Sequence, residues 1–77
     1  MPPSAVVKRS VSIHGHRTSF SLEQEFFAEL EAIAKQRGLS LAALVAEIDE
    51  TRPRNTNLSS ALRLAVLAHL KAGRSPA

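Results

Sequence analysis

The sequence predicts a small, mainly helical protein with one β-region, which buries its helices against a second copy of the chain. Three observations favour this fold class. The chain is short, a period-two apolar pattern is confined to residues 8–22, and apolar residues at helical spacing follow it. A chain of 77 residues without cysteine buries only about 60% of its unfolded surface and has no disulfide to compensate. We therefore expect an obligate homodimer.

The apolar composition also favours burial against a second copy. Hydrophobic residues make up 44% of the chain, but the only aromatic rings are those of Phe20, Phe26 and Phe27. Aromatic side chains normally carry much of the burial in a small core, so the Ala, Leu and Val residues of the expected helices need a partner surface. No apolar run approaches the length of a membrane span, about 18 residues, and no secretion signal is evident. The expected location is the cytoplasm.

Charge is distributed unevenly along the chain, whose net charge is +3. Residues 1–22 contain three basic residues and no acid, and residues 51–77 contain five basic residues and no acid. Residues 23–50 contain all seven acids and only two basic residues. The two ends are therefore candidates for contact with a polyanion, whereas the middle third is expected to be a solvated helical face.

The β-region, residues 8–22, changes its pattern in the middle. Apolar side chains alternate with serine in both halves, which is a strand signal. The alternating apolar residues are odd-numbered before the change (Val11, Ile13) and even-numbered after it (Phe20, Leu22). One regular strand places residues of one parity on one face. The chain must therefore bulge, turn or break at His-Gly-His, residues 14–16, where the glycine permits it.

The rest of the chain divides into helices and connections within one domain, residues 8–72. Apolar residues at every third or fourth position predict helices at 24–37, 41–50 and 58–72. Gly38 is expected to end the first helix, and Ser40 and Asn57 are expected to cap the second and third. Residues 1–7 are expected to be a disordered arm, and residues 73–77 a tail.

Three sequence blocks follow one another in the order strand, helix, loop: TSFSLE at 18–23, FFAEL at 26–30 and RGLS at 37–40. Sixteen positions separate the last apolar residue of the strand, Leu22, from the loop glycine, Gly38. In this order and register, residues 17–50 resemble the ribbon-helix-helix repressors of the MetJ, Arc and CopG type. The wider pattern, with VKRSV at 7–11 and NLSSALR at 57–63, resembles a bacterial branch of that superfamily with an extra C-terminal helix.

The resemblance implies how such a chain binds DNA. A lone strand leaves backbone groups unpaired, so the strands of two copies pair antiparallel into a ribbon that fits the major groove. Phe20 and Leu22 would then face the helices. Their neighbours Arg17, Ser19 and Ser21 would point outward and contact base edges. Arg17 is suited to a bidentate contact with guanine, and the serine hydroxyls can donate or accept hydrogen bonds.

The resemblance also implies a separate phosphate-binding site at the amino end of the second helix. Here that site consists of the backbone at Leu39, Ser40 and Leu41 with the Ser40 hydroxyl, because a helix N-terminus offers free N–H donors to an anion. Lys8 and Arg9 are expected to add phosphate contacts that weaken with salt.

Residues 8–16 leave one alternative open, because they are additional to the minimal fold. They could form a second strand or a hairpin that covers the ribbon. In that case the DNA contacts could shift to Arg9 or His16.

We expect a homodimer that binds duplex DNA sequence-specifically, regulates transcription by repression and is not an enzyme. The chain is too small for a deep cleft, and it lacks a glycine-rich phosphate loop and a nucleophile–base set. His14 and His16 are too few ligands for a zinc site. No metal and no cofactor are therefore expected.

Two rival functions remain. An antitoxin or adaptor would bind a protein partner through residues 58–70, and exposure of Leu64 and Leu67 in the free dimer would favour it, whereas their burial would favour the DNA function. A nonspecific nucleoid-type protein would bind duplexes without sequence preference.

Overall fold

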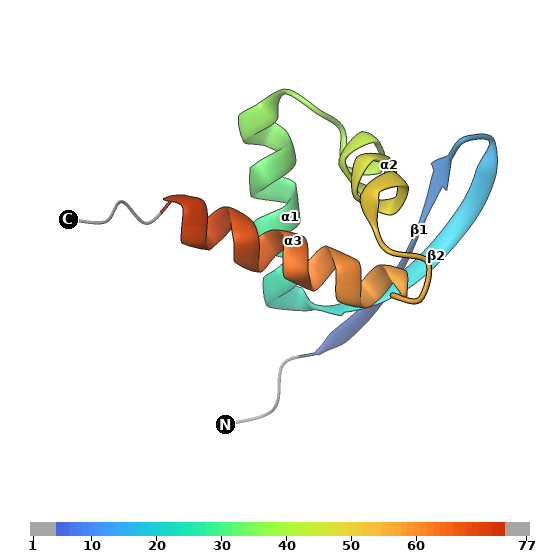
Figure 1. The fold of residues 1–77 in the computed structure, drawn as a ribbon, viewed down its shortest axis with the longest axis horizontal. Helices are drawn as coiled ribbons and strands as arrows, with labels where there is room; N and C mark the ends of the chain where they lie inside the picture. Colours follow the sequence, from blue (N-terminus) through green and yellow to red (C-terminus); the bar gives the residue numbers. More distant parts are fainter. Residues whose placement is uncertain (1–4, 74–77) are drawn as a thin grey trace.

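A computed structural model describes residues 5–73 and shows a β-hairpin followed by three helices (Figure 1). The strands are β1 (Val6–Ile13) and β2 (His16–Glu23). The helices are α1 (Gln24–Arg37), α2 (Leu41–Thr51) and α3 (Leu58–Gly73). This order confirms the predicted fold class, a β-ribbon followed by two helices and a third, C-terminal helix. None of the helices within residues 5–73 is long and apolar enough to cross a membrane.

The hairpin pairs β1 and β2 antiparallel, from Val6 opposite Glu23 to Ile13 opposite His16. The turn between them consists of His14 (φ 50°) and Gly15 (φ 77°). Two successive residues with positive φ indicate the type I′ geometry, which suits the twist of a hairpin. Because the turn has two residues, odd positions of β1 and even positions of β2 face the same side. The parity change in the sequence is thus explained as a chain reversal.

The N-terminal region differs from the expectation in one respect and resolves an open alternative. Val6 and Val7 belong to β1 and not to the arm, because they pair with Glu23 and Leu22. The arm's residues 1–4 lie outside the described part of the chain. Of the alternatives for residues 8–16, the structure has the hairpin, so the ribbon that it describes lies within one chain. A two-residue turn closes such a pairing at a low entropy cost. Pairing between two copies stays a prediction.

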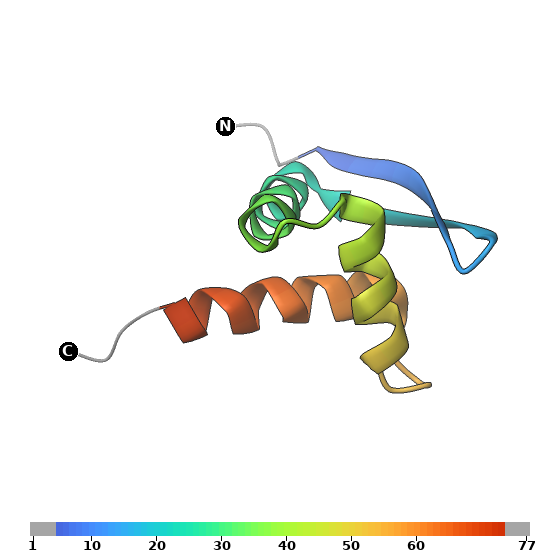
Figure 2. The same ribbon diagram turned by 90° about the horizontal axis from the view of Figure 1, so that it is seen from above.

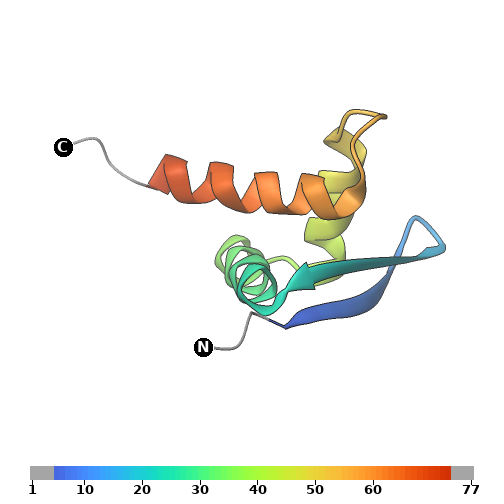
Figure 3. The same cartoon turned by 90° about the horizontal axis from the view of Figure 1, so that it is seen from below.

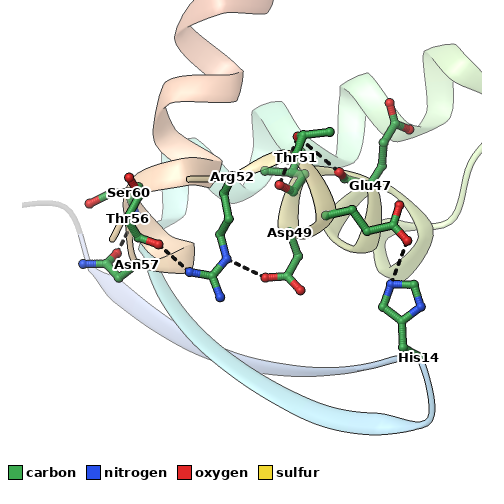
Figure 4. Close-up of polar contacts among 10 residues, drawn as sticks. His14, Glu47, Asp49, Thr51, Arg52, Thr56, Asn57 and Ser60 are labelled. Carbon is green, nitrogen blue, oxygen red and sulfur yellow. Dashed lines mark hydrogen bonds and ion pairs between the residues drawn. The ribbon is translucent and has the colours of Figure 1, made fainter. Parts of the chain in front are cut away.

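The helix ends have the caps that the sequence indicates. Gly38 ends α1 in the left-handed conformation (φ 71°), which glycine adopts without a Cβ penalty. The Ser40 hydroxyl accepts a hydrogen bond of 3.0 Å from the Ala43 N–H at the start of α2. The Asn57 side chain accepts one of 2.8 Å from the Ser60 N–H at the start of α3 (Figure 4).

Arg52 holds the connection between α2 and α3. Its Nε donates to a carboxylate oxygen of Asp49 at 2.6 Å, and its Nη1 donates to the carbonyl of Thr56 (Figure 4). The guanidinium therefore joins the end of α2 to the segment that leads into α3.

All three helices lie on one side of the hairpin and form the core with it (Figure 2). Thirteen hydrophobic side chains among the described residues are buried: Ile13, Phe20, Leu22, Phe27, Leu30, Ile33, Ala34, Leu44, Val45, Leu58, Ala61, Leu62 and Val66. Every element contributes to this set, and all of its members come from one chain. The described residues thus enclose a core without a second copy, which the composition did not lead us to expect.

α3 contacts that core with one face only. Leu58, Leu62 and Val66 are buried, whereas Leu64 and Leu67 on the other face are 59% and 50% exposed. Within one chain, α3 is therefore packed on one side only, although its apolar residues extend beyond that side. Figure 3 shows α3 on the side of the molecule opposite the hairpin. Its outer face therefore points away from the outward face of the sheet.

Candidate nucleic-acid interface

The face of the hairpin that points away from the helices carries hydroxyl and basic side chains from both strands. Its six residues form three cross-strand pairs: Lys8 with Ser21, Ser10 with Ser19, and Ser12 with Arg17. We call these six residues the ribbon face. Ser21 is half-buried and the other five are exposed. Ile13 and His16, which flank the two-residue turn, form a hydrogen-bonded pair, and the two kinds of pair alternate along an antiparallel hairpin. The three pairs of the ribbon face therefore occupy non-hydrogen-bonded positions, where facing side chains approach most closely.

Ser10 and Ser19 are joined at the centre of the ribbon face, where their Oγ atoms lie 2.9 Å apart. One hydroxyl donates to the other, so the pair keeps one free hydrogen and several free lone pairs. Sequence reasoning selected Ser19 but not Ser10. Assuming a two-residue turn at 14–15 would have identified Ser10, because that turn places it directly opposite Ser19.

The ribbon face carries positive charge and no acid. Lys8 and Arg17 lie at diagonally opposite corners. Glu23, at the end of β2, accepts a hydrogen bond of 3.1 Å from Nε of Arg63 in α3. A hydrogen bond from its own backbone N–H and the guanidinium of Arg63 hold the pKa of Glu23 below its ordinary value. The carboxylate is therefore ionised, but the adjacent guanidinium balances its charge.

Arg63 of α3 contacts both α1 and β2. Its guanidinium lies 6.0 Å from the centroid of the Phe26 ring, in addition to the ion pair with Glu23. Arg63 thus ties α3 to the start of α1 and the end of β2, a contact between residues forty positions apart. Lys71, near the end of α3, is exposed, and Arg74 lies outside the described residues.

Arg9 and His16 alternate with the residues of the ribbon face along their strands, so they lie on the helix-facing side of the hairpin. The guanidinium carbon of Arg9 is 4.9 Å from the centroid of the Phe27 ring, a cation–π distance. Arg9 thereby covers a ring that is completely buried. Of these basic positions in the hairpin, the fold directs Lys8 outward, not Arg9 or His16.

The N-terminus of α2 lies at the level of the hairpin, because α2 begins beside the sheet and runs away from it (Figures 1 and 2). The first turn of a helix leaves N–H groups without intrahelical partners. The N–H of Leu39 is already used, because it donates to the Ala34 carbonyl at 2.8 Å. Among the three positions selected from the sequence, Ser40 and Leu41 therefore have the geometry for an anion contact.

His14 ties the tip of the hairpin to α2. Its Nε2 lies 3.0 Å from Oε1 of Glu50, and both side chains are exposed (Figure 4). An exposed pair of this kind contributes little stability. Within residues 5–73, no three His, Cys, Asp or Glu side chains are grouped so that they could hold a metal ion.

Comparison with known proteins gives one match. A family model described as a ribbon-helix-helix domain matches residues 6–70, which include both strands and nearly all of the three helices. No curated protein and no solved structure matched the chain.

Proposed function

The chain belongs to the ribbon-helix-helix family, and from this membership we propose that it binds duplex DNA sequence-specifically through the ribbon face. Proteins of this family are generally DNA-binding regulators of transcription, and they typically bind DNA as dimers. The further steps, binding in the major groove and repression of transcription by a homodimer, are part of the proposal. The observation that carries it is the ribbon face itself, which combines two cations and four hydroxyls and has no acid.

The shape of the hairpin suits the major groove. Neighbouring strands lie about 5 Å apart, and the major groove is about 12 Å wide, so a two-stranded ribbon fits with its side chains. The ribbon is open on its outward face, because all three helices lie on the other side. Nothing in the described chain has to move for this face to approach DNA.

Each residue of the proposed contact has a role set by its chemistry. Arg17 donates two hydrogen bonds to O6 and N7 of a guanine, and Ser19 and Ser21 exchange hydrogen bonds with neighbouring base edges. Lys8 and the start of α2 at Ser40 and Leu41 contact phosphates. Arg9 and Leu39, also selected from the sequence, are weaker candidates, because the Arg9 side chain covers Phe27 and the Leu39 N–H is engaged.

Fluorescence anisotropy of labelled duplexes tests the proposal. The DNA carries the label because the protein has no Trp or Tyr. We compare the protein's own upstream region with a scrambled duplex over a salt series, and then select from random duplexes. Preference for particular sequences at physiological salt is expected. Equal affinity for every duplex, with a steep dependence on salt, would show that the protein binds DNA nonspecifically.

Arg17→Ala and Lys71→Ala form a matched pair of variants. Both remove one exposed cation, but Arg17 belongs to the ribbon face whereas Lys71 lies on α3. Arg17→Ala is expected to cost about 1–3 kcal/mol in specific binding and to relax the preference for one base. Lys71→Ala should leave the base preference unchanged. Undiminished affinity and specificity in a folded Arg17→Ala protein would contradict the proposal.

A second candidate function rests on the exposed leucines of α3. An antitoxin or adaptor would use Leu64 and Leu67 to bind a protein partner, and both are at least half exposed in a single chain. Failure of the wild-type protein to bind any duplex at low salt would favour this function. Replacing both leucines by serine should then abolish partner binding and leave the fold intact.

A further inference from the structure

The outer face of α3 carries exposed leucines between two exposed cations. Leu64 and Leu67 are 59% and 50% exposed. Lys71 is exposed on the same face, because residues at spacings of three, four and seven share one face of a helix. Arg54, in the connection that leads into α3, is exposed before the other end. We call these four residues the α3 patch.

Nothing in the described chain neutralises the two cations of the α3 patch. Residues 51–73 contain no acid. Arg52 and Arg63, the other two Arg or Lys residues of this segment, each form an ion pair with an acid from an earlier element. Arg54 and Lys71 form no ion pair within the described part of the chain. A molecule that covers the leucines therefore gains by supplying negative charge at both ends.

A hollow lies beside the leucines, between α3 and the end of α2. Its volume is about 280 Å³, and its lining includes Leu64 and the apolar side chains of Ile48, Pro53, Ala61 and Ala65. Protein interfaces are commonly anchored by a few large side chains that fill pockets of this kind. The hollow thus suits an apolar side chain that protrudes from a partner.

We propose that the α3 patch binds an amphipathic helix of a partner protein, whose apolar stripe has acidic residues at both ends. The leucines and the hollow bind the stripe, and Arg54 and Lys71 pair with the acids. The part of α3 from its first residue to Lys71 is about 20 Å long, so the two acidic ends lie about four helical turns apart.

This surface is independent of the proposed DNA binding. α3 lies on the side of the molecule opposite the hairpin (Figure 3), so a helix on its outer face does not cover the ribbon face. The inference specifies the partner's chemistry for the exposed leucines, and it holds whether or not the ribbon face binds DNA.

The charges disfavour a second copy of the chain as the occupant. Two α3 helices that pack antiparallel bring Arg54 of each copy toward Lys71 of the other. Two that pack parallel bring identical cations together. Like charges that face each other across an interface weaken binding, and residues 51–73 supply no acid to offset them.

The shape disfavours a lipid surface as the occupant. A helix that lies in a membrane interface presents a broad apolar face, commonly with Trp or Phe. α3 instead buries Leu58, Leu62 and Val66 in the protein core and leaves a narrow set of leucines outside. The chain has no Trp, and its three Phe residues precede α3.

The test uses a fluorescein-labelled synthetic peptide of about 15 residues, long enough for four helical turns. It carries leucines at helical spacing and glutamates at both ends, and its matched control carries lysines in place of the glutamates. Anisotropy is measured as full-length protein is added. The glutamate peptide should bind with micromolar affinity, because an interface of one helix is small. The lysine peptide should bind at least about tenfold more weakly.

Three protein variants assign the binding to the α3 patch. The double variant Leu64→Ser, Leu67→Ser should weaken binding of the glutamate peptide at least about tenfold. The double variant Arg54→Glu, Lys71→Glu should reverse the preference, so that the lysine peptide binds more tightly. Lys35→Glu reverses an exposed cation of α1 outside the patch and should leave both affinities unchanged. Circular dichroism confirms that each variant is folded.

Several outcomes would overturn the proposal. The first is failure of the glutamate peptide to bind, and the second is equal affinity for the two peptides. Self-association in analytical ultracentrifugation that the double serine variant abolishes would assign the patch to a second copy. Binding to anionic lipid vesicles that the same variant abolishes would assign it to a membrane. None of these measurements uses DNA, so failure of the proposed DNA binding and failure of this inference are observed separately.

Discussion

Replacing Leu62 by alanine tests whether α3 is part of the core of one chain. Leu62 lies in the first half of α3 and is completely buried, in the same cluster as Leu22 and Phe27. Removing a fully buried leucine side chain loses its transfer free energy and leaves a cavity, at a combined cost of about 2–5 kcal/mol. Small domains have a total stability of about 5–15 kcal/mol, so the effect should be large.

Leu67→Ala is the matched control, because it makes the same chemical change on the same helix. Leu67 is 50% exposed and points away from the core, so its replacement should change stability by only about 0.5 kcal/mol. For a domain of this size, 1 kcal/mol shifts Tm by about 4–8 °C. Leu62→Ala should therefore lower Tm by about 12–24 °C for a cost near 3 kcal/mol, and Leu67→Ala by no more than about 4 °C.

Circular dichroism measures both variants by thermal and urea unfolding, at several protein concentrations. A loss of less than about 1 kcal/mol for Leu62→Ala would refute the burial of α3 in this core. A loss for Leu67→Ala as large as that for Leu62→Ala, with a Tm that rises with protein concentration, would show that a second copy covers the outer face of α3. The pair of variants thus also tests whether the dimer is obligate.

Two smaller perturbations address a helix cap and an ion pair. Ser40→Ala removes the hydrogen bond to the Ala43 N–H and should lower the free energy of unfolding by about 1 kcal/mol in urea, whereas Ser40→Thr should restore most of it; equal stability of all three proteins would contradict the cap. The pKa of Glu23 is held below its ordinary 4.5, so its contribution to stability is complete above that value and is lost as the pH falls through the lowered pKa. The urea midpoints of wild type and Glu23→Gln, measured above and below pH 4.5, should differ above this pH and converge below it. A difference that stays constant with pH would exclude this linkage.

Local sequence signals determined the helix caps and the reversal of the chain in the β-region. Gly38 and Ser40 are effective because a left-handed residue and a capping hydroxyl depend only on the nearest few residues. The change of parity between Ile13 and Phe20 likewise required the chain to break its alternation near Gly15, whatever the rest of the chain does. The outward parity of Arg17, Ser19 and Ser21 follows from the burial of Phe20 and Leu22 alone.

Only the tertiary structure decided which surfaces meet. A strand with free edges can pair with a neighbour in its own chain or in a second copy, and periodicity is the same in both cases; the two-residue turn favours the first and adds Ser10 and Ser12 to the ribbon face. The partner of Arg63 is forty residues away, so no local pattern could identify it. The apolar residues of α3 are too numerous for one face, and it took the packing of α1, α2 and the hairpin to bury Leu62 and leave Leu67 exposed. Long-range contacts of this kind depend on where whole elements lie in space, which short-range spacing along the chain does not encode.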